Sequence, residues 1–369
     1  MIRVGLVGLG KMGISHQAIL NAHPDLELAA VCDTTGYLLS VMHRFTGVST
    51  YTDYGTMLDK AELDAVVIAT PPDSHVFLVE KALERGLHVF CEKPFALDPA
   101  DGLRLAEKAE AAGVVNQVGY HYRFVGSFVY LKHLLDIGAI GQVHHVQSEA
   151  YGPVVLRAKT ATWRSAKGGG GGSLYDYASH VVDLVNFCFG RPDFIRGAVM
   201  HSIFSAQVDD EVYATLGYND GKSVQLSVNW SDESQRKMSA KLSVWGTRGK
   251  IVADRQGLQL FLREPFAPEN LTQGWTVRYT TDLTEPVDFY LRGEEYSAQI
   301  DHFAKAILAG DTATRSTFRS SVETDQIVDA IRSESQRPPT LIEGAVAATA
   351  APAAPSRKGI IGRLLGPAR

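Results

Sequence analysis

The sequence predicts an α/β protein: an N-terminal, doubly wound parallel sheet followed by an α+β domain with a large, mainly antiparallel open sheet. Three observations predict this fold class. A glycine-rich loop joins the first apolar strand to a helix. Strand-like and helical runs alternate through residues 1–120, which is typical of βαβ units. From residue 121 onward, several runs alternate apolar and polar residues, which is typical of antiparallel strands with one buried face.

The glycine-rich loop lies between a buried strand and a helix. Residues 2–7 (IRVGLV) are apolar and strand-like, and residues 8–13 (GLGKMG) follow at once. We expect Gly8 to permit a tight turn, Gly10 to let the backbone approach a pyrophosphate, and Gly13 to let the helix pack closely on the strand. The N–H groups and the dipole at the helix start favour an anion. The loop therefore predicts a Rossmann dinucleotide-binding domain.

Asp33 follows the second apolar strand, residues 28–32, and stands twenty residues after Gly13. A carboxylate at this position can accept hydrogen bonds from a ribose 2′-OH and would repel a 2′-phosphate. Residues 34–37 (TTGY) contain no Arg or Lys that would offset the repulsion. Asp33 therefore favours NAD(H) over NADP(H). The alternative is that Asp33 is the N-cap of a helix that starts at Gly36.

Two further segments are expected to line the cofactor cleft, because ligands of parallel sheets bind at the carboxyl ends of the strands. The strand-like run at 65–69 ends in residues 70–75 (TPPDSH), and the run at 89–91 ends in residues 92–94 (EKP). The predicted cofactor contacts are Gly8, Gly10, Lys11, Met12, Gly13, Asp33, Thr70, Pro71, Pro72, His75, Glu92 and Lys93.

The composition limits the classes of partner and compartment. The 369 residues are 45% hydrophobic and 21% charged, with a net charge of −5, which disfavours nucleic acid as a general partner. The three cysteines are widely spaced and no Cys/His cluster has zinc spacing, so we expect buried thiols and no metal. The chain starts with a core strand, and no apolar run reaches transmembrane length. We therefore expect a cytoplasmic protein without an integral membrane span.

The expected domains are a dinucleotide-binding domain at residues 1–120 and a substrate-binding and oligomerisation domain at residues 121–340. One face of the second sheet should pack on helices, while the other face is a natural surface for a homodimer or homotetramer. Residues 341–369 are Ala/Pro-rich with a basic end and are expected to be a disordered tail. Within the second domain we expect helices near 124–137, 174–189, 293–309 and 318–334, a strand near 143–150, and hairpin turns at 219–221 (NDG) and 246–249 (GTRG).

Four motifs occur in a recognisable order along the chain. These are the glycine loop, residues 70–75, residues 92–94, and Asp176-x-x-x-His180. Together they resemble the Gfo/Idh/MocA family of sugar and cyclitol oxidoreductases, over about residues 1–338. The resemblance implies an NAD-dependent dehydrogenase that acts on a secondary alcohol of a sugar, nucleotide sugar or cyclitol. Two alternatives remain: an enzyme of the same fold that keeps NAD bound and processes glycosides, and a non-catalytic regulator that senses the dinucleotide.

The resemblance implies that Lys93, Asp176 and His180 carry catalysis. Lys93 would contact the substrate hydroxyl and stabilise a developing alkoxide. His180 would be the general base, because imidazole titrates near neutral pH. Asp176, on the same helix face, would bind or orient the substrate hydroxyl, or share the proton with Lys93. Considered alone, these residues could be a surface lysine, a helix N-terminal charge and a buried histidine. Ser173 is a candidate N-cap, and Ala178 stands where relatives often have glycine.

Aromatic and arginine side chains are candidates for substrate recognition. Rings stack on the C–H faces of sugars, and a guanidinium group can bind a carboxylate or phosphate through two hydrogen bonds. The arginines favour an anionic or nucleotide-linked sugar, although ordinary salt bridges and buried aromatic rings would explain the same residues. The candidates are His121, Arg123, Tyr151, Trp163, Arg164 and Tyr177.

Overall fold

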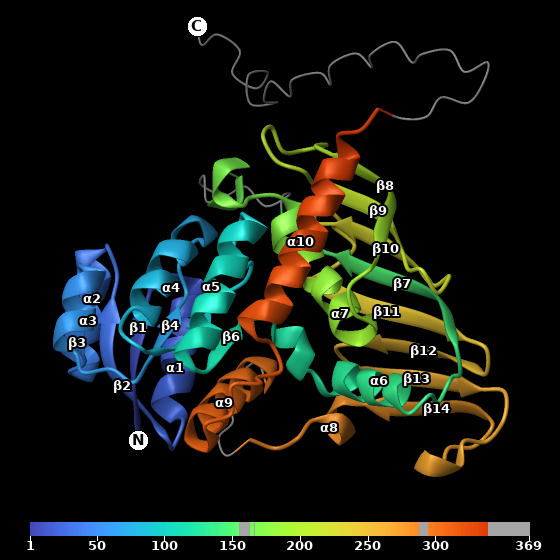
Figure 1. The fold of residues 1–369 in the computed structure, drawn as a ribbon, viewed down its shortest axis with the longest axis horizontal. Coiled ribbons are helices and arrows are strands. Elements are labelled where there is room, and N and C mark those ends of the chain that lie inside the picture. Colours follow the sequence, from blue (N-terminus) through green and yellow to red (C-terminus); the bar gives the residue numbers. More distant parts are fainter. Residues whose placement is uncertain (155–162, 166, 288–293, 339–369) are drawn as a thin grey trace, which may run out of the picture. The chain divides into compact units, whose positions relative to one another are not determined.

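The structure is a computed structural model that describes residues 1–154, 163–165, 167–287 and 294–338. The predicted tail at 341–369 lies outside these residues. A parallel sheet with the strand order β3-β2-β1-β4-β5-β6 forms the N-terminal part (Figure 1). Its strands are β1 (Ile2–Val7), β2 (Leu26–Cys32), β3 (Ser49–Tyr51), β4 (Ala65–Ile68), β5 (His88–Cys91) and β6 (Asn116–Val118). Strand β3 was not expected from the sequence, because its three exposed or partly exposed residues carry too little apolar pattern.

Helices cover both faces of this sheet, as its alternating side chains show. In β4, Val66 and Ile68 pack on one side with residues of α3, α4 and α5, while Ala65 and Val67 pack on the other side with residues of α1, α2 and α9. Both faces are therefore buried, as a parallel sheet requires. These helices are α1 (Lys11–Ala22), α2 (Gly36–Thr46), α3 (Tyr54–Lys60), α4 (His75–Leu83), α5 (Pro99–Ala112) and α9 (Glu294–Ala309).

The second sheet has eight strands in the order β14-β13-β12-β11-β7-β10-β9-β8. Neighbouring strands are antiparallel except for β7 and β10, which are parallel. The expected turns at 219–221 and 246–249 join β9 to β10 and β11 to β12, so the prediction of a mainly antiparallel sheet is confirmed. The strands are β7 (Val143–Tyr151), β8 (Phe194–His201), β9 (Glu211–Gly217), β10 (Ser223–Asn229), β11 (Ser239–Gly246), β12 (Gly249–Asp254), β13 (Gly257–Leu262) and β14 (Gly274–Tyr279).

One face of the second sheet is covered by helices α6 (Gly126–Asp136), α7 (Ser179–Phe189) and α10 (Phe318–Ser335), as Figure 1 shows. Alternate residues of β10, such as Val224 and Leu226, are buried in the core with residues of these helices. The opposite face keeps large apolar side chains exposed on the edge strand β14. The short helix α8 (Thr280–Leu283) follows that strand.

The C-terminal helices connect the two sheets. Helix α9 packs on α1, and α10 contacts both α5 and β8. The ring of Phe318 in α10 stacks on Phe95 with centroids 4.2 Å apart, and Asp325 accepts a hydrogen bond from the backbone N–H of Ala96 at 3.0 Å. The segment that follows β5, which contains Lys93, is therefore anchored by a helix that lies more than two hundred residues later in the chain.

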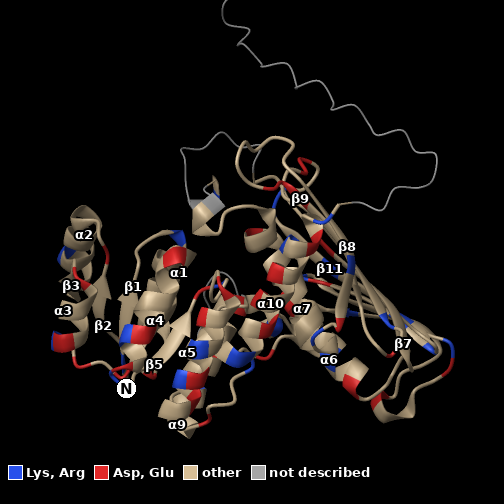
Figure 2. Ribbon diagram, turned by 45° about the horizontal axis from the view of Figure 1, so that its top comes forward, with Lys and Arg blue, Asp and Glu red and all other residues tan. Residues whose placement is uncertain are grey.

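The outer surface of the N-terminal part carries charges of both signs. In Figure 2, basic and acidic residues lie side by side on α4 and α5. Glu80 contributes to this pattern by pairing with both Arg104 and Lys108. Exposed pairs of this kind contribute only about 0–1 kcal/mol each to stability. None of the described helices is long and apolar enough to cross a lipid bilayer.

Candidate active site

The three glycines of the first loop have three different environments. Gly8 has a φ of 95°, and a Cβ there would lie 2.7 Å from the carbonyl oxygen of Ala69. A Cβ on Gly13 would lie 1.9 Å from the carbonyl oxygen of Gly8, so the close packing of helix on strand excludes any side chain. A Cβ on Gly10 would meet no described atom within 4 Å. The open space over Gly10, at the start of α1, fits a pyrophosphate that binds the N–H groups of the helix.

Asp33 connects the end of β2 to the glycine loop. Its Oδ2 accepts a hydrogen bond from the N–H of Leu9 at 2.6 Å, and its Oδ1 accepts one from the N–H of Thr35 at 2.7 Å. Thr35 precedes the first residue of α2 and is itself the N-cap residue. Asp33 therefore holds the backbone of Thr35 just before α2, but it is not the N-cap of that helix. Each carboxylate oxygen keeps a second lone pair that a ribose hydroxyl could use.

His75 links the loop that follows β4 to the loop that follows β5. Its Nδ1 lies 2.9 Å from the carbonyl oxygen of Pro94, and its Nε2 lies 3.0 Å from the carbonyl oxygen of Thr70. The ring is fully buried, and this burial lowers the pKa of His75. Both nitrogens face the protein, so the expected contact of His75 with a cofactor is not available to them. Pro71 is exposed beside this loop, whereas Pro72 is buried.

Glu92 is also committed to contacts within the protein. Its Oε1 lies 2.7 Å from Nε2 of His16, a fully buried residue of α1, and its Oε2 accepts a hydrogen bond from the N–H of Lys93 at 3.3 Å. A Cβ on Gly119 would lie 2.9 Å from Oε2 of Glu92, so the neighbouring backbone approaches the carboxylate closely. Through these contacts Glu92 supports the loop that contains Lys93.

Lys93 reaches from the first sheet to Asp176 in the second part of the chain. The Lys93–Pro94 peptide is cis. The ammonium Nζ donates hydrogen bonds to the carbonyl oxygen of Asp176 at 2.9 Å and to its Oδ1 at 3.0 Å. Arg164 donates from Nε to the other carboxylate oxygen at 2.8 Å. Burial alone would raise the pKa of Asp176, but the two neighbouring cations lower it to about 2.

Asp176 lies in a turn of π-helix, Leu174–Ala178, that continues directly into α7. The expectation that Ser173 caps this helix is wrong. The Ser173 hydroxyl donates to Oδ2 of Asp209 at 2.6 Å, and the same oxygen accepts the N–H of Leu174 at 2.7 Å. Asp209 comes from a distant segment of the chain, so tertiary packing supplies this cap. Single π-turns within helices are frequent at functional sites.

His180 lies near the start of α7 among aromatic rings. The centroid of its ring is 4.8 Å from that of His121 and 5.2 Å from that of Tyr122. Its Nδ1 is buried and has no hydrogen-bond partner among the described residues. Burial lowers the pKa of His180 well below the usual value, and the charges of Lys93 and other nearby cations lower it further. The imidazole is therefore neutral near pH 7 and able to accept a proton.

Three residues that the sequence analysis did not select border this site. Tyr296, in the first turn of α9, stacks on His121 with centroids 4.6 Å apart and an interplanar angle of 25°. Glu295 precedes it, and Arg255 in the turn between β12 and β13 forms an ion pair with Glu295. The sequence around each of these residues is that of an ordinary helix or turn, so no local pattern could identify them as members of the site.

The polar groups of two of the predicted substrate contacts are engaged within the protein. Arg123 is buried and forms an ion pair with Asp183 through Nε and Nη2, at 2.8 and 2.6 Å, so the alternative of an ordinary salt bridge describes it. Tyr151 lies on the face of β7 opposite to α7, because residues alternate along a strand, and its hydroxyl donates to Ser227 at 2.9 Å.

The remaining predicted substrate residues have three different outcomes. Tyr177 is buried in the core of the second sheet and forms an edge contact with the ring of Trp230, so the alternative of a buried aromatic ring describes it. The side chain of Trp163 lies outside the described part of the chain. Arg164 and His121 lie beside Asp176 and His180, respectively. Of the five candidates whose side chains the structure describes, two therefore lie at the site.

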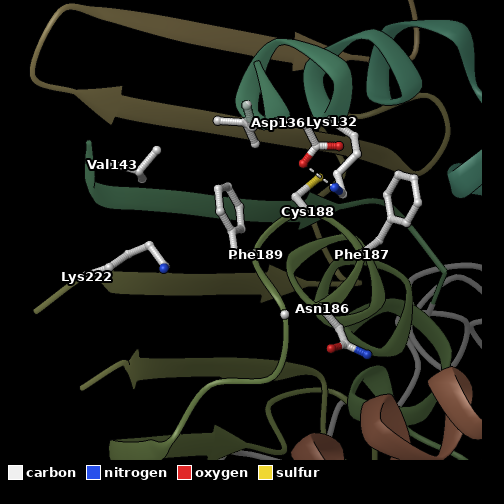
Figure 3. A pocket seen from close by; sticks show the side chains of 10 residues that line it. Lys132, Asp136, Val143, Asn186, Phe187, Cys188, Phe189 and Lys222 are labelled. Carbon is white, nitrogen blue, oxygen red and sulfur yellow. Dashed lines mark hydrogen bonds and ion pairs between the residues drawn. The ribbon is translucent and has the colours of Figure 1, made fainter. Parts of the chain in front are cut away.

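A separate cavity of about 420 Å³ lies between α6 and the C-terminal end of α7 (Figure 3). Phe187 and Phe189 flank it, and the polar side chains Lys132 and Asp136 in its lining form an ion pair with each other. His180 is at the other end of α7. The residues that line this cavity do not include Lys93, Asp176 or His180.

The ionised Asp176 is expected to stabilise the fold in a pH-dependent way. Its pKa is lowered from 3.8 to about 2, so its contribution is complete above about pH 4 and is lost as the pH falls towards 2. We expect Asp176→Asn to lower the free energy of unfolding by about 2 kcal/mol at pH 7 and by progressively less below pH 4. Urea unfolding at several pH values measures this difference. The exposed control Asp136→Asn should show little change, and a pH-independent loss in Asp176→Asn would contradict the prediction.

Comparison with known proteins finds two family models on this chain. Residues 2–120 match a model described as oxidoreductase family, NAD-binding Rossmann fold, and residues 128–252 match the GFO/IDH/MocA C-terminal domain. The rhizopine catabolism protein MocA of Rhizobium meliloti is 30% identical over 230 residues, which are 61% of this chain and 70% of that protein. Inositol 2-dehydrogenase of Rhizobium meliloti strain 1021 is 26% identical over 338 residues, 88% of this chain and 98% of that protein.

Solved structures share the architecture. Levoglucosan dehydrogenase in complex with NADH and levoglucosan superimposes with a TM-score of 0.80 at 23% identity, covering 90% of this chain and 97% of that chain. At this level of identity the likeness establishes the fold.

Proposed function

The chain belongs to the GFO/IDH/MocA oxidoreductase family, and from this membership we propose that it transfers hydride between NAD and a secondary alcohol or ketone of a sugar, nucleotide sugar or cyclitol. Membership makes the chain an NAD-dependent oxidoreductase. The observation that carries the finer proposal is the meeting of Lys93, from the first sheet, with Asp176 at the start of the helix that contains His180. We assign cofactor binding to residues 1–120 and substrate binding to residues 121–340.

The described residues fit the cofactor at the glycine loop. Gly10 leaves open space at the start of α1, where Lys11 and Met12 begin the helix, and Asp33 lies at the neighbouring strand end. We assign the pyrophosphate to the first of these sites and the adenosine ribose to the second. When bound, the nicotinamide accepts or supplies the hydride.

Proton transfer is assigned to His180. Its neutral imidazole can take the hydroxyl proton during oxidation of the alcohol. Lys93 would donate a hydrogen bond to the same oxygen and stabilise the alkoxide as it forms. We assign to Asp176 the role of holding the ammonium group in place instead of acting as the base, because its two carboxylate oxygens are paired with Lys93 and Arg164.

A substrate screen tests this proposal. The purified protein is offered inositols, free hexoses, uronic acids and nucleotide-linked sugars, each with NAD⁺ or NADP⁺, and NADH or NADPH formation is followed by absorbance. We expect turnover of one class with NAD⁺ preferred, because the carboxylate of Asp33 repels a 2′-phosphate. Release of NADH on turnover separates a dehydrogenase from an enzyme that keeps NAD bound. The proposal would be contradicted if none of these compounds is oxidised and none of the corresponding ketones is reduced with NADH.

We also propose that the chain forms a homodimer or homotetramer through the uncovered face of the second sheet. Trp275, Val277 and Tyr279 on β14 are 60%, 49% and 63% exposed, and Trp275 lies against Phe261 of the neighbouring strand. Exposed apolar groups of this size are typical of interaction sites.

The oligomer prediction uses a double variant. Trp275→Asp combined with Tyr279→Asp is expected to sediment as a smaller species than the wild type, because two carboxylates would be buried unpaired in the interface. Sedimentation equilibrium measures the mass. Phe45→Asp on α2, where the side chain is 78% exposed, is the matched control. A wild-type monomer, or an unchanged mass in the double variant, would exclude this face.

We further infer a cytoplasmic location. Cys32, Cys91 and Cys188 are free thiols, and all three are buried. Thiols that persist unpaired are typical of a reducing compartment. Cell fractionation with an antibody against the protein tests this inference, and recovery in a periplasmic or secreted fraction would contradict it.

A further inference from the structure

Helix α10 packs on elements from both parts of the proposed site. It contacts α5, which follows the Lys93 loop, and α7, which contains His180 (Figure 1). Phe318 and Asp325 stand seven residues apart in α10, which places them on one face of the helix. Thr324 precedes Asp325 and is turned by about 100° around the helix axis relative to it. Adjacent residues of α10 can therefore contact two different elements.

The first of these faces holds the segment that follows Lys93. Oδ2 of Asp325 accepts the backbone N–H of Ala96 at 3.0 Å, and the ring of Phe318 stacks on that of Phe95. All four residues of these contacts are buried. Because Ala96 stands three residues after Lys93, the hydrogen bond from Asp325 holds the backbone of the Lys93 loop from its C-terminal side.

The neighbouring face of α10 holds α7. The hydroxyl of Thr324 donates to Oδ1 of Asp183 at 3.1 Å, and the backbone carbonyl of Ser320, one turn earlier, accepts the side-chain amide of Asn186 at 3.1 Å. Thr324 and Asp183 are both fully buried. Asp183 stands three residues after His180 in α7. Two adjacent residues of α10 thus bind the element of Lys93 and the element of His180.

We propose that Thr324 and Asp325 are positioning residues that fix the backbone of Lys93 relative to that of His180. This inference rests on the proposed function, in which the ammonium group and the imidazole act on one substrate hydroxyl. The ion pair with Asp176 holds the end of the Lys93 side chain, but the flexible four-carbon stem leaves the backbone to be held separately. A misplacement of about 1 Å between reacting groups can lower a rate about 10²-fold.

A carboxyl group at position 325 is costly for a residue that only fills space. Burial raises the pKa of Asp325 well above its usual value, because the surroundings disfavour the charged form. An apolar side chain would avoid the desolvation of the carboxyl group. Only an acceptor can form the directional hydrogen bond to Ala96, which fixes the backbone of the segment in one place.

Removal of the Asp325 carboxyl group tests the proposal. Asp325→Ala is expected to lower kcat for the substrate found in the screen by about 10–10²-fold, with a smaller change in KM. Asp325→Asn should retain most of the kcat, because its amide oxygen can accept the N–H of Ala96. The control Asp329→Ala removes a carboxylate one turn later in α10, where it pairs with Arg332, and should leave kcat unchanged. Equal kcat values in Asp325→Ala and Asp329→Ala would overturn the proposal.

A double-mutant cycle separates positioning from general damage. If Asp325 acts through Lys93, the losses caused by Asp325→Ala and Lys93→Met are not additive. In the Lys93→Met background, Asp325→Ala should therefore lower kcat by a much smaller factor than in the wild-type background. General damage to the fold would lower kcat by the same factor in both backgrounds, and this result would overturn the proposal.

Thr324 offers a second pair of variants, which keeps the proposal testable if Asp325→Ala does not fold. Thr324→Val keeps the shape of the side chain but removes the donor to Asp183, whereas Thr324→Ser keeps the hydroxyl group. We expect kcat to fall about tenfold in Thr324→Val and to stay near the wild-type value in Thr324→Ser. Equal kcat values in these two variants would exclude the positioning role of Thr324.

The outcomes distinguish this proposal from the proposed function. If Asp325→Ala oxidises the substrate at the wild-type rate, the positioning role fails and the dehydrogenase activity stands. If no sugar is oxidised and no ketone is reduced, the dehydrogenase proposal fails, and hydrogen exchange tests the positioning by itself. The N–H of Ala96 should then exchange faster in Asp325→Ala than in the wild type, with exchange in the glycine loop unchanged. Equal exchange at Ala96 in Asp325→Ala and Asp329→Ala would overturn the positioning role.

Discussion

Replacing Lys93 with Met is expected to lower kcat for the substrate found in the screen by about 10²–10³-fold. Methionine keeps most of the side-chain volume but removes the ammonium group that would stabilise the alkoxide. The substitution also leaves Asp176 with Arg164 as its remaining charged partner, so the π-turn that contains Asp176 loses its link to the first sheet. Because the lost interaction strengthens as charge develops on oxygen, kcat should fall more than KM rises.

Two controls separate this loss from general damage. Lys108→Met on the outer face of α5 removes an exposed lysine and should leave kcat at the wild-type value. Binding of NADH, followed by fluorescence, should change little in Lys93→Met, because the glycine loop is untouched. A kcat of Lys93→Met close to that of the wild type would show that Lys93 takes no part in the chemical step.

Replacing His180 with Ala is expected to lower the rate of alcohol oxidation by about 10²–10⁴-fold, the range attributed to a general base. The pH dependence has a defined sign. Oxidation requires the neutral imidazole, and burial holds the pKa of His180 well below its usual value. The wild-type rate should therefore be level through neutral pH and fall only in acid, as the imidazole becomes protonated. The variant should lose this acid limb, which pH profiles of kcat/KM for both proteins would reveal.

The control for His180 is His133→Ala, which removes an exposed histidine of α6 that pairs with Glu269. It should retain both the rate and the pH profile. If His180→Ala kept the acid limb, another group would be the titrating base. If it kept the rate as well, His180 would be a packing residue among the rings of His121 and Tyr122.

Local chemistry explains why part of the site could be predicted. The roles of Gly8, Gly10 and Gly13 depend on backbone conformation and close approach within one βαβ unit, so their spacing carries the information. The same holds for Asp33 at the end of β2, whose distance from the loop along the chain is set by one helix and one strand. The two sheets were likewise predictable in outline, the first from the alternation of apolar strands with helices and the second from period-two alternation and hairpin turns, because these patterns are local properties.

The sequence by itself determined the fold class, the dinucleotide loop and, through resemblance, the set Lys93, Asp176 and His180. Only the tertiary structure decided which other side chains reach that set. Arg123 pairs with the buried carboxylate of Asp183. Arg255 and Glu295, which come from distant segments of the chain, pair with each other beside the site. A buried charge must find a partner wherever the packing supplies one, and contacts between residues far apart in the chain leave no periodic trace in the sequence.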